Sequence, residues 1–402
     1  MKRVINSIHL MSIVVVLLLS LPLLVTANDG MWNPHLCEIK VKESGEKTVI
    51  CIPPVWNGDL VVYAHGYVAP QEELELPTDE LMIDDETFVP AILMGMGYAF
   101  ATTSFSTNGY AVKEGASDIN ALVEAFTIQI PTNNVFVLGA SEGGLIATML
   151  VEKYPETYDG GLALCGPVGG MPYQIQYLAD FRVVFDYFFK GVFHFGAIEA
   201  DEEDVEDWDA VYMPAIEGRI LSGLHSTKTK QLFEVVNVPE GPTDGDIVEA
   251  AQDILKYNIK GFNDLIEKAG GNPYDNRWRW YRDSDNDWKD DWKMNLHVER
   301  VQGDSEAKQY VRDYYKPTGD LKKPLVTLHT EEDPIVPYRH ELIYFLRTLA
   351  KGNSTNLVSF PASSYGHCNF TPPQVLGSFC TLVWMSPGTL PDVCKAYLES
   401  MQ

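Results

Sequence analysis

A chain of 402 residues that is 46% apolar and 21% charged has enough apolar side chains for a large buried core, which excludes a disordered chain as the default. Its length favours one large domain that carries an insertion, or two domains. The formal net charge of −26 repels phosphate backbones and anionic lipids, so we expect no nucleic acid among its partners.

The first 27 residues have the pattern of an export signal. Lys2 and Arg3 form a short basic region, residues 11–25 are almost continuously apolar, and residues 25–27 are small enough for a signal peptidase. We predict cleavage after Ala27 and a secreted or periplasmic protein. The alternative is an uncleaved membrane anchor, which the apolar length nearly permits. No later stretch is apolar enough to span a bilayer, so we expect no stable membrane insertion after cleavage.

Six cysteines are an even number, and export favours disulfide bonds. Position along the chain suggests that Cys37 pairs with Cys51 across a predicted hairpin. It also suggests that Cys380 pairs with Cys394 around a turn. Cys165 and Cys368 would then remain, each just after a predicted strand. Six cysteines allow fifteen connectivities, so these pairings are conjectures. The alternative is that one or two pairs stay reduced and buried.

Between residues 48 and 166, short apolar runs alternate with helical patterns. The pattern predicts strands at 60–64, 98–103, 135–139 and 161–165, and helices at 116–128 and 145–154. Strands that alternate with helices indicate a parallel, doubly wound sheet that is buried on both faces.

The same alternation returns near the C-terminus, with predicted strands at 324–328 and 356–360 and a helix at 339–350. Residues 168–318 differ, because they are rich in aromatic and acidic residues and contain few runs suited to a parallel strand. Helical patterns occur there at 181–189 and 247–259. We interpret this stretch as a cap over the edge of the sheet where ligands bind. The predicted core therefore comprises residues 28–167 and 319–402.

Gly139-Ala140-Ser141-Glu142-Gly143 fits the G-x-S-x-G pattern and stands between a predicted strand and a predicted helix. A sharp turn there would strain the backbone of Ser141 and would require small neighbours such as Gly139 and Gly143. The turn also places the hydroxyl at a helix N-terminus, where the dipole favours negative charge. We predict that Ser141 is a nucleophile; the alternative is a glycine-rich turn without chemistry.

A serine hydroxyl is a poor nucleophile until a base removes its proton. His367 lies in a loop beyond the last predicted strand, from which it can reach over the sheet edge to Ser141. The other eight histidines lie in the signal peptide, before the sheet, in the cap, on a helix or at strand ends. Packing roles suffice for His65 and His329, which end strands. We predict that His367 is the general base.

The imidazole must be held in one tautomer, and its cation must be stabilised by an acid. Asp333 directly follows a predicted core strand, and Pro334 fixes the backbone beside it. This arrangement indicates a positioned turn rather than a solvated acidic run, although Glu331 and Glu332 are local rivals. We predict that Asp333 orients His367.

An acyl-transfer transition state needs hydrogen-bond donors for its oxyanion. We predict the backbone N–H groups of Glu142, which follows the nucleophile, and of Tyr67, which follows the strand ending in His65-Gly66. Gly66 would let the backbone approach a substrate. The alternative for this loop is an ordinary strand-end turn.

The order Ser141, Asp333, His367 and the layout of strands and helices resemble the α/β-hydrolase superfamily over about residues 48–166 and 320–400. His65-Gly66-Tyr67 resembles its HG-x oxyanion segment, and residues 333–337 resemble its acid turn. The resemblance implies an α/β-hydrolase fold, with a mostly parallel doubly wound sheet and a mainly helical cap inserted between the sixth and seventh core strands.

Within the superfamily the chain is most similar to secreted bacterial esterases and their peptidase relatives. A serine rather than an aspartate at 141 disfavours haloalkane dehalogenases and epoxide hydrolases, and there is no HGGPG run like that of proline iminopeptidases. Cys368 after the histidine resembles the tannase and feruloyl esterase group. In that group a cysteine also precedes the serine, whereas this chain has Ala140.

Two weaker patterns lie in the cap. Residues 283–287 alternate oxygen ligands as a calcium loop does, but Trp288 and Met294 replace the required glycine and glutamate, so we favour an acidic turn. Aromatic residues cluster nearby and could form a substrate platform, although we favour the cap's own small core. They are Trp278, Trp280, Tyr281, Trp288 and Trp292.

These residues predict a metal-independent, two-step acyl transfer that needs no cofactor. We expect a small-molecule or polymer ester as substrate, because ester cleavage demands less protonation of the leaving group than amide cleavage. One rival is a secreted peptidase or amidase with the same triad. Another is a binding protein that keeps the fold without catalysis, which would predict a degraded triad. The acyl and alcohol groups and the oligomeric state stay open.

Overall fold

The computed structural model describes residues 31–83, 87–283, 287–388 and 390–400. The predicted export signal at 1–27 lies outside these ranges. Within them, no helix is both long and apolar enough to cross a membrane.

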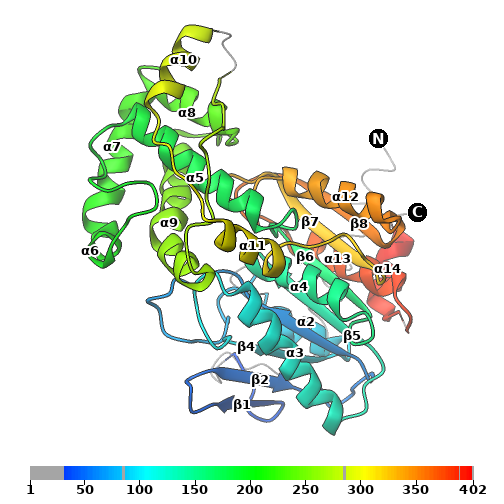
Figure 1. Ribbon diagram of the computed structural model, residues 1–402. Coiled ribbons are helices and arrows are strands. Elements are labelled where there is room, and N and C mark those ends of the chain that lie inside the picture. The colour runs from blue at the N-terminus through cyan, green and yellow to red at the C-terminus, as the bar shows by residue number, and fades with distance from the viewer. Residues whose placement is uncertain (1–30, 84–86, 284–286, 389, 401–402) are drawn as a thin grey trace.

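An eight-stranded sheet forms the centre of the molecule (Figure 1). Its strands are β1 (Cys37–Val41), β2 (Lys47–Cys51), β3 (Leu60–Ala64), β4 (Ala99–Thr103), β5 (Val135–Ala140), β6 (Gly160–Leu164), β7 (Leu325–Glu332) and β8 (Leu357–Tyr365). The order across the sheet is β1-β2-β4-β3-β5-β6-β7-β8. All pairs from β4 to β8 are parallel, and β1 and β2 add an antiparallel edge. The mostly parallel sheet predicted from the sequence is confirmed.

Strand β3 shows why the central strands read as continuous apolar runs. All five of its side chains are buried, because both faces of the sheet are covered. Leu60 and Val62 belong to the core on one face, and Val61 and Tyr63 belong to the core on the other. This is the period of two that a strand imposes on its side chains.

Helices cover both faces of the sheet (Figure 1). On one face lie α3 (Val112–Gln129), α4 (Glu142–Lys153) and α12 (Arg339–Lys351), and on the other lie α2 (Val89–Gly95), α13 (Pro372–Met385) and α14 (Asp392–Ser400). A short 3₁₀ helix, η2 (Ser354–Asn356), leads into β8. The doubly wound arrangement is the one expected.

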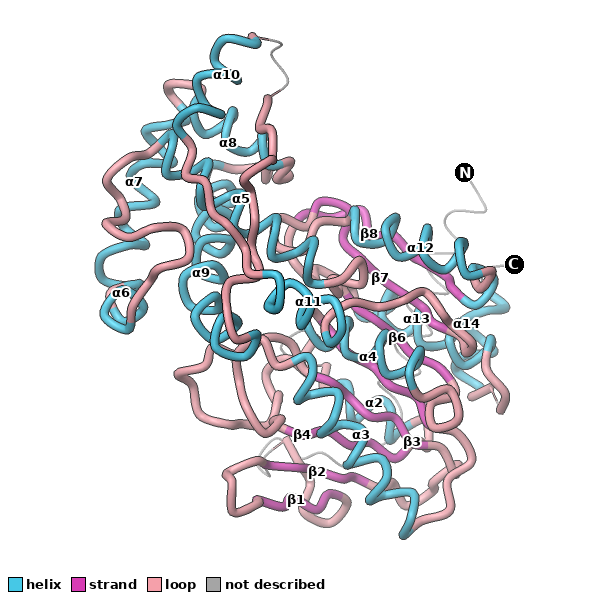
Figure 2. Tube along the Cα trace, in the orientation of Figure 1, coloured by secondary structure: helices cyan, strands magenta, loops and turns pink. Residues whose placement is uncertain are grey.

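The insertion between β6 and β7 is helical and contains no strand among its described residues (Figure 2). Its elements are α5 (Met171–Phe188), α6 (Glu202–Glu206), the π-helix η1 (Trp208–Tyr212), α7 (Met213–Leu224), α8 (Lys228–Val236), α9 (Asp244–Ala269), α10 (Trp288–His297) and α11 (Ser305–Tyr314). Its buried side chains join the core on the α3 and α4 face of the sheet. The predicted cap between the sixth and seventh strands is therefore present.

Helix α9 extends the predicted helix at 247–259 at both ends. Thr243 caps its start and exchanges hydrogen bonds with Asp246, and Gly270 ends it in the left-handed conformation at φ 68°. Its middle is one apolar stripe that includes Ile254, Leu255 and Ile259. Capping residues set these ends, whereas apolar periodicity alone predicted only the middle.

The interpretation of the cap's aromatic cluster as a small core is wrong for its tryptophans. Trp278, Trp280, Trp288 and Trp292 are 92%, 54%, 65% and 51% exposed. Trp288 and Trp292 lie four residues apart on α10 and share its outer face, and Met294 is the buried residue of that helix. Tyr281 alone of the cluster is buried, and its hydroxyl donates to Asp180 at 2.7 Å.

Candidate active site

Ser141 stands at a sharp turn between β5 and α4. Its backbone has φ 52° and ψ −123°, a conformation that residues other than glycine rarely adopt. Helix α4 begins at the next residue. Its N–H donates to the carbonyl oxygen of Leu164 at the end of β6. The strained strand-to-helix turn predicted from the sequence is present.

The glycines around Ser141 make this turn possible. A Cβ on Gly139 would overlap the carbonyl oxygen of Gly143, and a Cβ on Gly143 would overlap that of Ala64. The backbone of the turn therefore packs directly against β3, and side chains larger than hydrogen at these two positions would push the strands apart.

The loop after β8 brings His367 to Ser141. The Nε2 atom of His367 lies 2.9 Å from Ser141 Oγ, and its Nδ1 atom lies 2.7 Å from Asp333 Oδ2. His367 is 226 positions from Ser141 in the chain and 34 positions from Asp333, yet the three side chains form one hydrogen-bonded series. A hydroxyl, an imidazole and a carboxylate in this order can move a proton from the hydroxyl to the ring.

Asp333 is fully buried in the turn after β7. Its Oδ1 atom accepts the N–H groups of Ile335 and Val336 at 2.8 and 2.9 Å, which leaves Oδ2 to face His367. Burial alone would raise the pKa of Asp333, but His367 and His329 outweigh burial and lower it to about 2. The group is therefore an anion at neutral pH. Its rivals Glu331 and Glu332 are exposed.

A second histidine supports Asp333 from behind. His329, in β7, has Nε2 3.6 Å from Asp333 Oδ2 and Nδ1 3.0 Å from Glu341 Oε1. Burial lowers the pKa of His329, but Asp333 and Glu341 outweigh it and raise the pKa to about 10. The buried ring is thus a cation between two carboxylates, so its role is electrostatic as well as packing.

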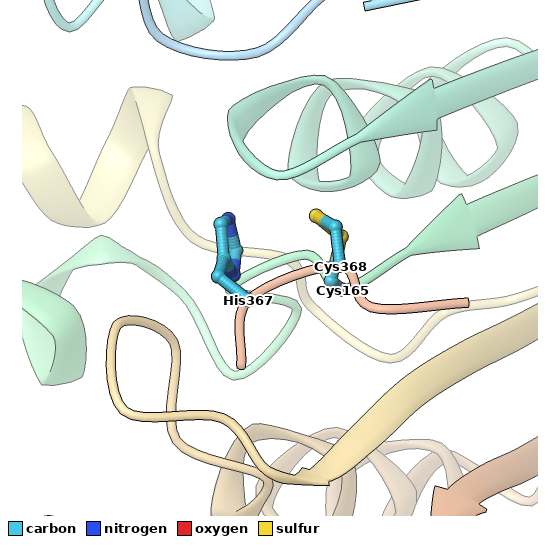
Figure 3. Close-up of side chains that lie close together, drawn as sticks. All are labelled: Cys165, His367 and Cys368. Atoms are coloured by element: carbon cyan, nitrogen blue, oxygen red, sulfur yellow. A yellow bond between two sulfur atoms is a disulfide. The ribbon is translucent and has the colours of Figure 1, made fainter. Parts of the chain in front are cut away.

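A disulfide bond joins Cys368, the residue after His367, to Cys165, the residue after β6. Figure 3 shows His367 beside the two cysteines. Their nitrogen and sulfur atoms lie within 4.8 Å of one another, but sulfurs joined in a disulfide offer no thiolate to a metal. The other conjectured pairs, Cys37–Cys51 and Cys380–Cys394, are also bonded, so all three pairings are confirmed.

The loop after β3 lies against the nucleophile. A Cβ on Gly66 would lie 3.3 Å from Ser141 Cβ, so glycine lets the two segments approach. The N–H of Gly66 donates to both carboxylate oxygens of Glu80 at 2.9 Å, and Tyr63 donates to the same group at 2.7 Å. Tyr67 and Glu142, which carry the predicted oxyanion donors, line one cavity together with Ser141.

Two carboxyl groups with raised pKa values at the site were not anticipated from the sequence. Burial raises the pKa of Glu142 to about 8, and desolvation of its carboxyl group raises the pKa of Glu80 to about 7. Glu142 Oε1 accepts the N–H of Ala111, which ties the start of α3 to the nucleophile turn. Neither carboxyl group has a sequence signal, because only the folded chain shows which groups surround these acids. Tyr257 of α9 reaches the same cavity from the cap.

The predicted acidic turn at 283–287 lies partly outside the described residues, which omit 284–286. At its ends, Asp283 Oδ2 accepts from Gln231 at 3.2 Å, and Asp287 caps the start of α10 by accepting the N–H of Lys289 at 3.0 Å. Asp287 is therefore the N-cap of α10, and the acidic turn itself stays a prediction.

Comparisons with known proteins give a short sequence match and broad structural likeness. Residues 109–194 match the profile of a family described as "Serine aminopeptidase, S33", a minority of the chain that includes Ser141 but neither Asp333 nor His367. No curated protein is significantly similar in sequence.

The solved structures that the chain is similar to share little sequence with it. An esterase of Pyrococcus furiosus is 15% identical, with 89% of this chain and 96% of that one covered and a TM-score of 0.43. An esterase from Aspergillus oryzae is 14% identical, with 81% and 71% covered and a TM-score of 0.44. An acylaminoacyl peptidase of Pyrococcus horikoshii is 11% identical at a TM-score of 0.41. The match covers 83% of this chain but only 38% of the peptidase.

The chain's own topology settles the architecture. Parallel strands from β4 to β8, a strained serine turn after β5 and a helical insertion between β6 and β7 are all present. The protein has the α/β-hydrolase fold.

Proposed function

We propose that the protein is an exported serine hydrolase that cleaves carboxylic esters, with Ser141 as nucleophile, His367 as general base and Asp333 as the acid that orients the base. The observation that carries this proposal is the hydrogen-bonded series from Ser141 Oγ through His367 to Asp333 Oδ2, with contacts of 2.9 and 2.7 Å. These three side chains meet although they come from segments far apart in the chain.

The reaction follows from this geometry. His367 Nε2 takes the proton as Ser141 Oγ attacks the carbonyl carbon, and Asp333 stabilises the imidazolium that forms. The ring then returns the proton to the departing alcohol oxygen, which leaves an acyl ester on Ser141. A water molecule, deprotonated by His367 in the same way, releases the acid.

The developing oxyanion needs donors near Ser141. The N–H of Glu142 is in the first turn of α4 and has no acceptor within its own helix, and Tyr67 lines the same cavity. We assign the two backbone N–H groups to the oxyanion on this basis. The chain's own groups provide each step of this mechanism, so we propose no metal and no cofactor.

A peptidase or amidase with the same residues is the second candidate. The observation that favours it is the match of residues 109–194 to the serine aminopeptidase family. Amide cleavage uses the same nucleophile and base but requires fuller protonation of a poorer leaving group. The relative turnover of matched esters and amides separates the two candidates.

The predicted export is part of this proposal. Three disulfide bonds among described residues support an oxidising compartment, because cytosolic thiols are kept reduced. We propose a secreted or periplasmic location after cleavage at Ala27.

Labelling with a fluorophosphonate probe tests the activated serine directly. We expect the purified wild-type protein to be labelled and Ser141→Ala to remain unlabelled, with a panel of short-chain p-nitrophenyl esters and anilides run on both. Ser363→Ala, near the end of β8, is the matched control and should label like the wild type. Folded wild-type protein that is neither labelled nor active would favour the non-catalytic binding protein.

A further inference from the structure

The carbonyl groups of the turn after Asp333 are held by side chains. The carbonyl oxygens of Pro334, Ile335 and Val336 each accept from a side chain, and among the described residues none of the three accepts a backbone N–H. The donor to Val336 is His329 of β7, at 2.8 Å. A buried carbonyl without a donor is unfavourable, so the side chains that donate to these carbonyls fix the course of the turn.

The other two donors belong to helix α5 of the cap. The hydroxyl of Tyr177 donates to the carbonyl oxygen of Pro334 at 2.5 Å, and the amide of Gln174 donates to that of Ile335 at 2.7 Å. Gln174 and Tyr177 are three positions apart, so they lie on one face of α5, and both are buried. The cap therefore holds the turn on one side while β7 holds it on the other.

Both cap side chains are fixed as donors. Burial and then the carboxylate of Asp333 raise the pKa of Tyr177 well above its usual value, so the hydroxyl keeps its proton. The carbonyl of Ile335 can only accept, so the NH₂ group of Gln174 faces it. The amide oxygen of Gln174 then faces His340 Nε2 at 3.0 Å, so both ends of the amide have partners.

The same two peptide groups also hold Asp333. The C=O of Pro334 and the N–H of Ile335 belong to one planar peptide group, which accepts from Tyr177 on one side and donates to Asp333 Oδ1 on the other. The next peptide group connects Gln174 to Asp333 Oδ1 in the same way, through the N–H of residue 336. Each cap side chain is thus one peptide plane away from the carboxylate.

Helix α5 connects this turn to the body of the cap. It runs from the edge of the sheet into the cap (Figure 1). One turn beyond Tyr177, Phe181 packs against Phe233 of α8, with the ring centroids 5.9 Å apart. The position of the cap and the orientation of Asp333 are therefore coupled through α5.

We propose that Gln174 and Tyr177 are positioning residues for the triad, which fix two peptide planes so that Asp333 Oδ1 is held and Oδ2 points at His367. The cap helix α5 is then part of the catalytic geometry as well as a cover over the sheet edge. This inference rests on the proposed function, because it concerns the acid that orients the general base.

Tyr177→Phe tests this role, because it removes one donor and keeps the ring. In the described part of the chain Tyr177 does not line the cavity at Ser141, so a substrate does not lose a contact. For p-nitrophenyl acetate we expect kcat to fall about tenfold, since a small displacement of Asp333 misplaces the base. KM should stay within about twofold of the wild-type value. Tyr212→Phe is the matched control and should keep the wild-type kcat, because its buried cap hydroxyl donates to Asp204 of α6.

A double-mutant cycle with Asp333→Asn identifies the path of the effect. A residue that acts through Asp333 has nothing left to position once that carboxylate is gone. In the Asp333→Asn background, Tyr177→Phe should therefore lower kcat by less than about twofold. A hydroxyl that only stabilises the cap would have the same effect on kcat in both backgrounds, and that result would overturn the inference.

Gln174→Met provides a second variant, which decides the inference if Tyr177→Phe does not fold. Methionine is close to glutamine in size but has no amide donor, so we expect the same loss of kcat and the same dependence on Asp333. Its control is Gln252→Met on α9, which loses an amide donor to the carbonyl of Met213. Gln174 lines the cavity at Ser141, so only kcat is compared for this variant.

The possible failures are distinguishable. Wild-type kcat in both Tyr177→Phe and Gln174→Met would overturn the positioning role and leave the proposed hydrolase intact. If the wild type is labelled by the fluorophosphonate probe but does not hydrolyse p-nitrophenyl acetate, the rate constant of labelling replaces kcat in the same cycle. A wild type that is neither labelled nor active would overturn the proposed function itself.

Discussion

At the residue scale, the two oxygens of Asp333 have different partners, and this division determines what a substitution does. Oδ1 accepts two backbone N–H groups, those of Ile335 and Val336, while Oδ2 faces His367 Nδ1. An asparagine at this position would keep the two backbone bonds only by placing its oxygen at Oδ1. Its NH₂ group would then face His367.

We therefore expect Asp333→Asn to fold and to lose activity. The amide donor would force Nδ1 of His367 to act as an acceptor, so that Nε2 carries the proton and cannot take one from Ser141. Ester kcat should fall by about 10³ to 10⁴, with a much smaller change in KM. Asp392→Asn, at an exposed helix start, is the control. A variant that keeps more than about a tenth of wild-type kcat would contradict the proposed role of Asp333.

At the scale of elements, the Cys165–Cys368 disulfide ties the His367 loop to the end of β6. It closes 203 residues of chain, and both cysteines have positive φ angles, at 46° and 53°. The backbone on each side of the bond is therefore held in a conformation that non-glycine residues rarely adopt. The bond fixes the loop that presents His367 to Ser141.

Replacing both Cys165 and Cys368 with alanine should lower stability and ester turnover together. The long closed loop predicts a loss of about 3 to 5 kcal/mol in the free energy of unfolding, which denaturant titration measures. We also expect kcat to fall by about tenfold, because His367 loses its anchor. The Cys37–Cys51 pair spans only 14 residues in the β1–β2 hairpin and provides the control. Equal kcat values for the two double variants would show that the disulfide does not position His367.

In the cap, the aromatic residues that lie close together in the sequence differ in solvent exposure. Tyr281 donates to the buried Asp180 at 2.7 Å and accepts from Asn276 at 3.1 Å, whereas Trp278 is almost fully exposed. Tyr281→Phe should lower the free energy of unfolding by about 1.5 to 3 kcal/mol, because a buried carboxylate loses a donor. Trp278→Ser should change it by less than about 0.5 kcal/mol. Thermal unfolding of the two variants measures both effects, and a reversed order would refute this description of the cap.

The same elements show what the sequence could and could not predict. Strands β3 to β6 were found because burial on both faces makes them continuous apolar runs, and the serine turn was found because its sterics demand glycine. Asp333 and His367 follow β7 and β8, and the ends of parallel strands lie at one edge of the sheet. This position was sufficient to predict that both residues lie close to Ser141. The environments of Glu142 and Trp278 were not predictable, because burial of an acid or exposure of a tryptophan is decided by segments distant in the chain.

At the scale of the whole molecule, a chain with a net charge of −26 contains carboxyl groups that stay protonated near neutral pH. Burial raises the pKa of Glu142 from 4.5 to about 8, and desolvation of its carboxyl group raises the pKa of Glu80 to about 7. Because the folded-state pKa lies above the unfolded value, the folded protein binds more protons between about pH 4.5 and 8. The stability linked to these groups is fully present below pH 4.5 and is lost as the pH rises through 7 and 8. The pKa of Asp333 is depressed to about 2, so its contribution is lost only in strong acid.

The free energy of unfolding should therefore fall between pH 5.5 and pH 8.5, and Glu142→Gln should reduce that fall. Glutamine does not ionise, so the part linked to Glu142, about 3 kcal/mol, should disappear from the difference between the two pH values. Urea titrations of the disulfide-intact protein at both pH values measure it. Glu217→Gln, at an exposed position of α7, is the control and should behave like the wild type. If Glu142→Gln retains the full wild-type pH dependence, Glu142 is ionised in the folded protein at neutral pH, and its buried carboxylate must then be balanced by a cation.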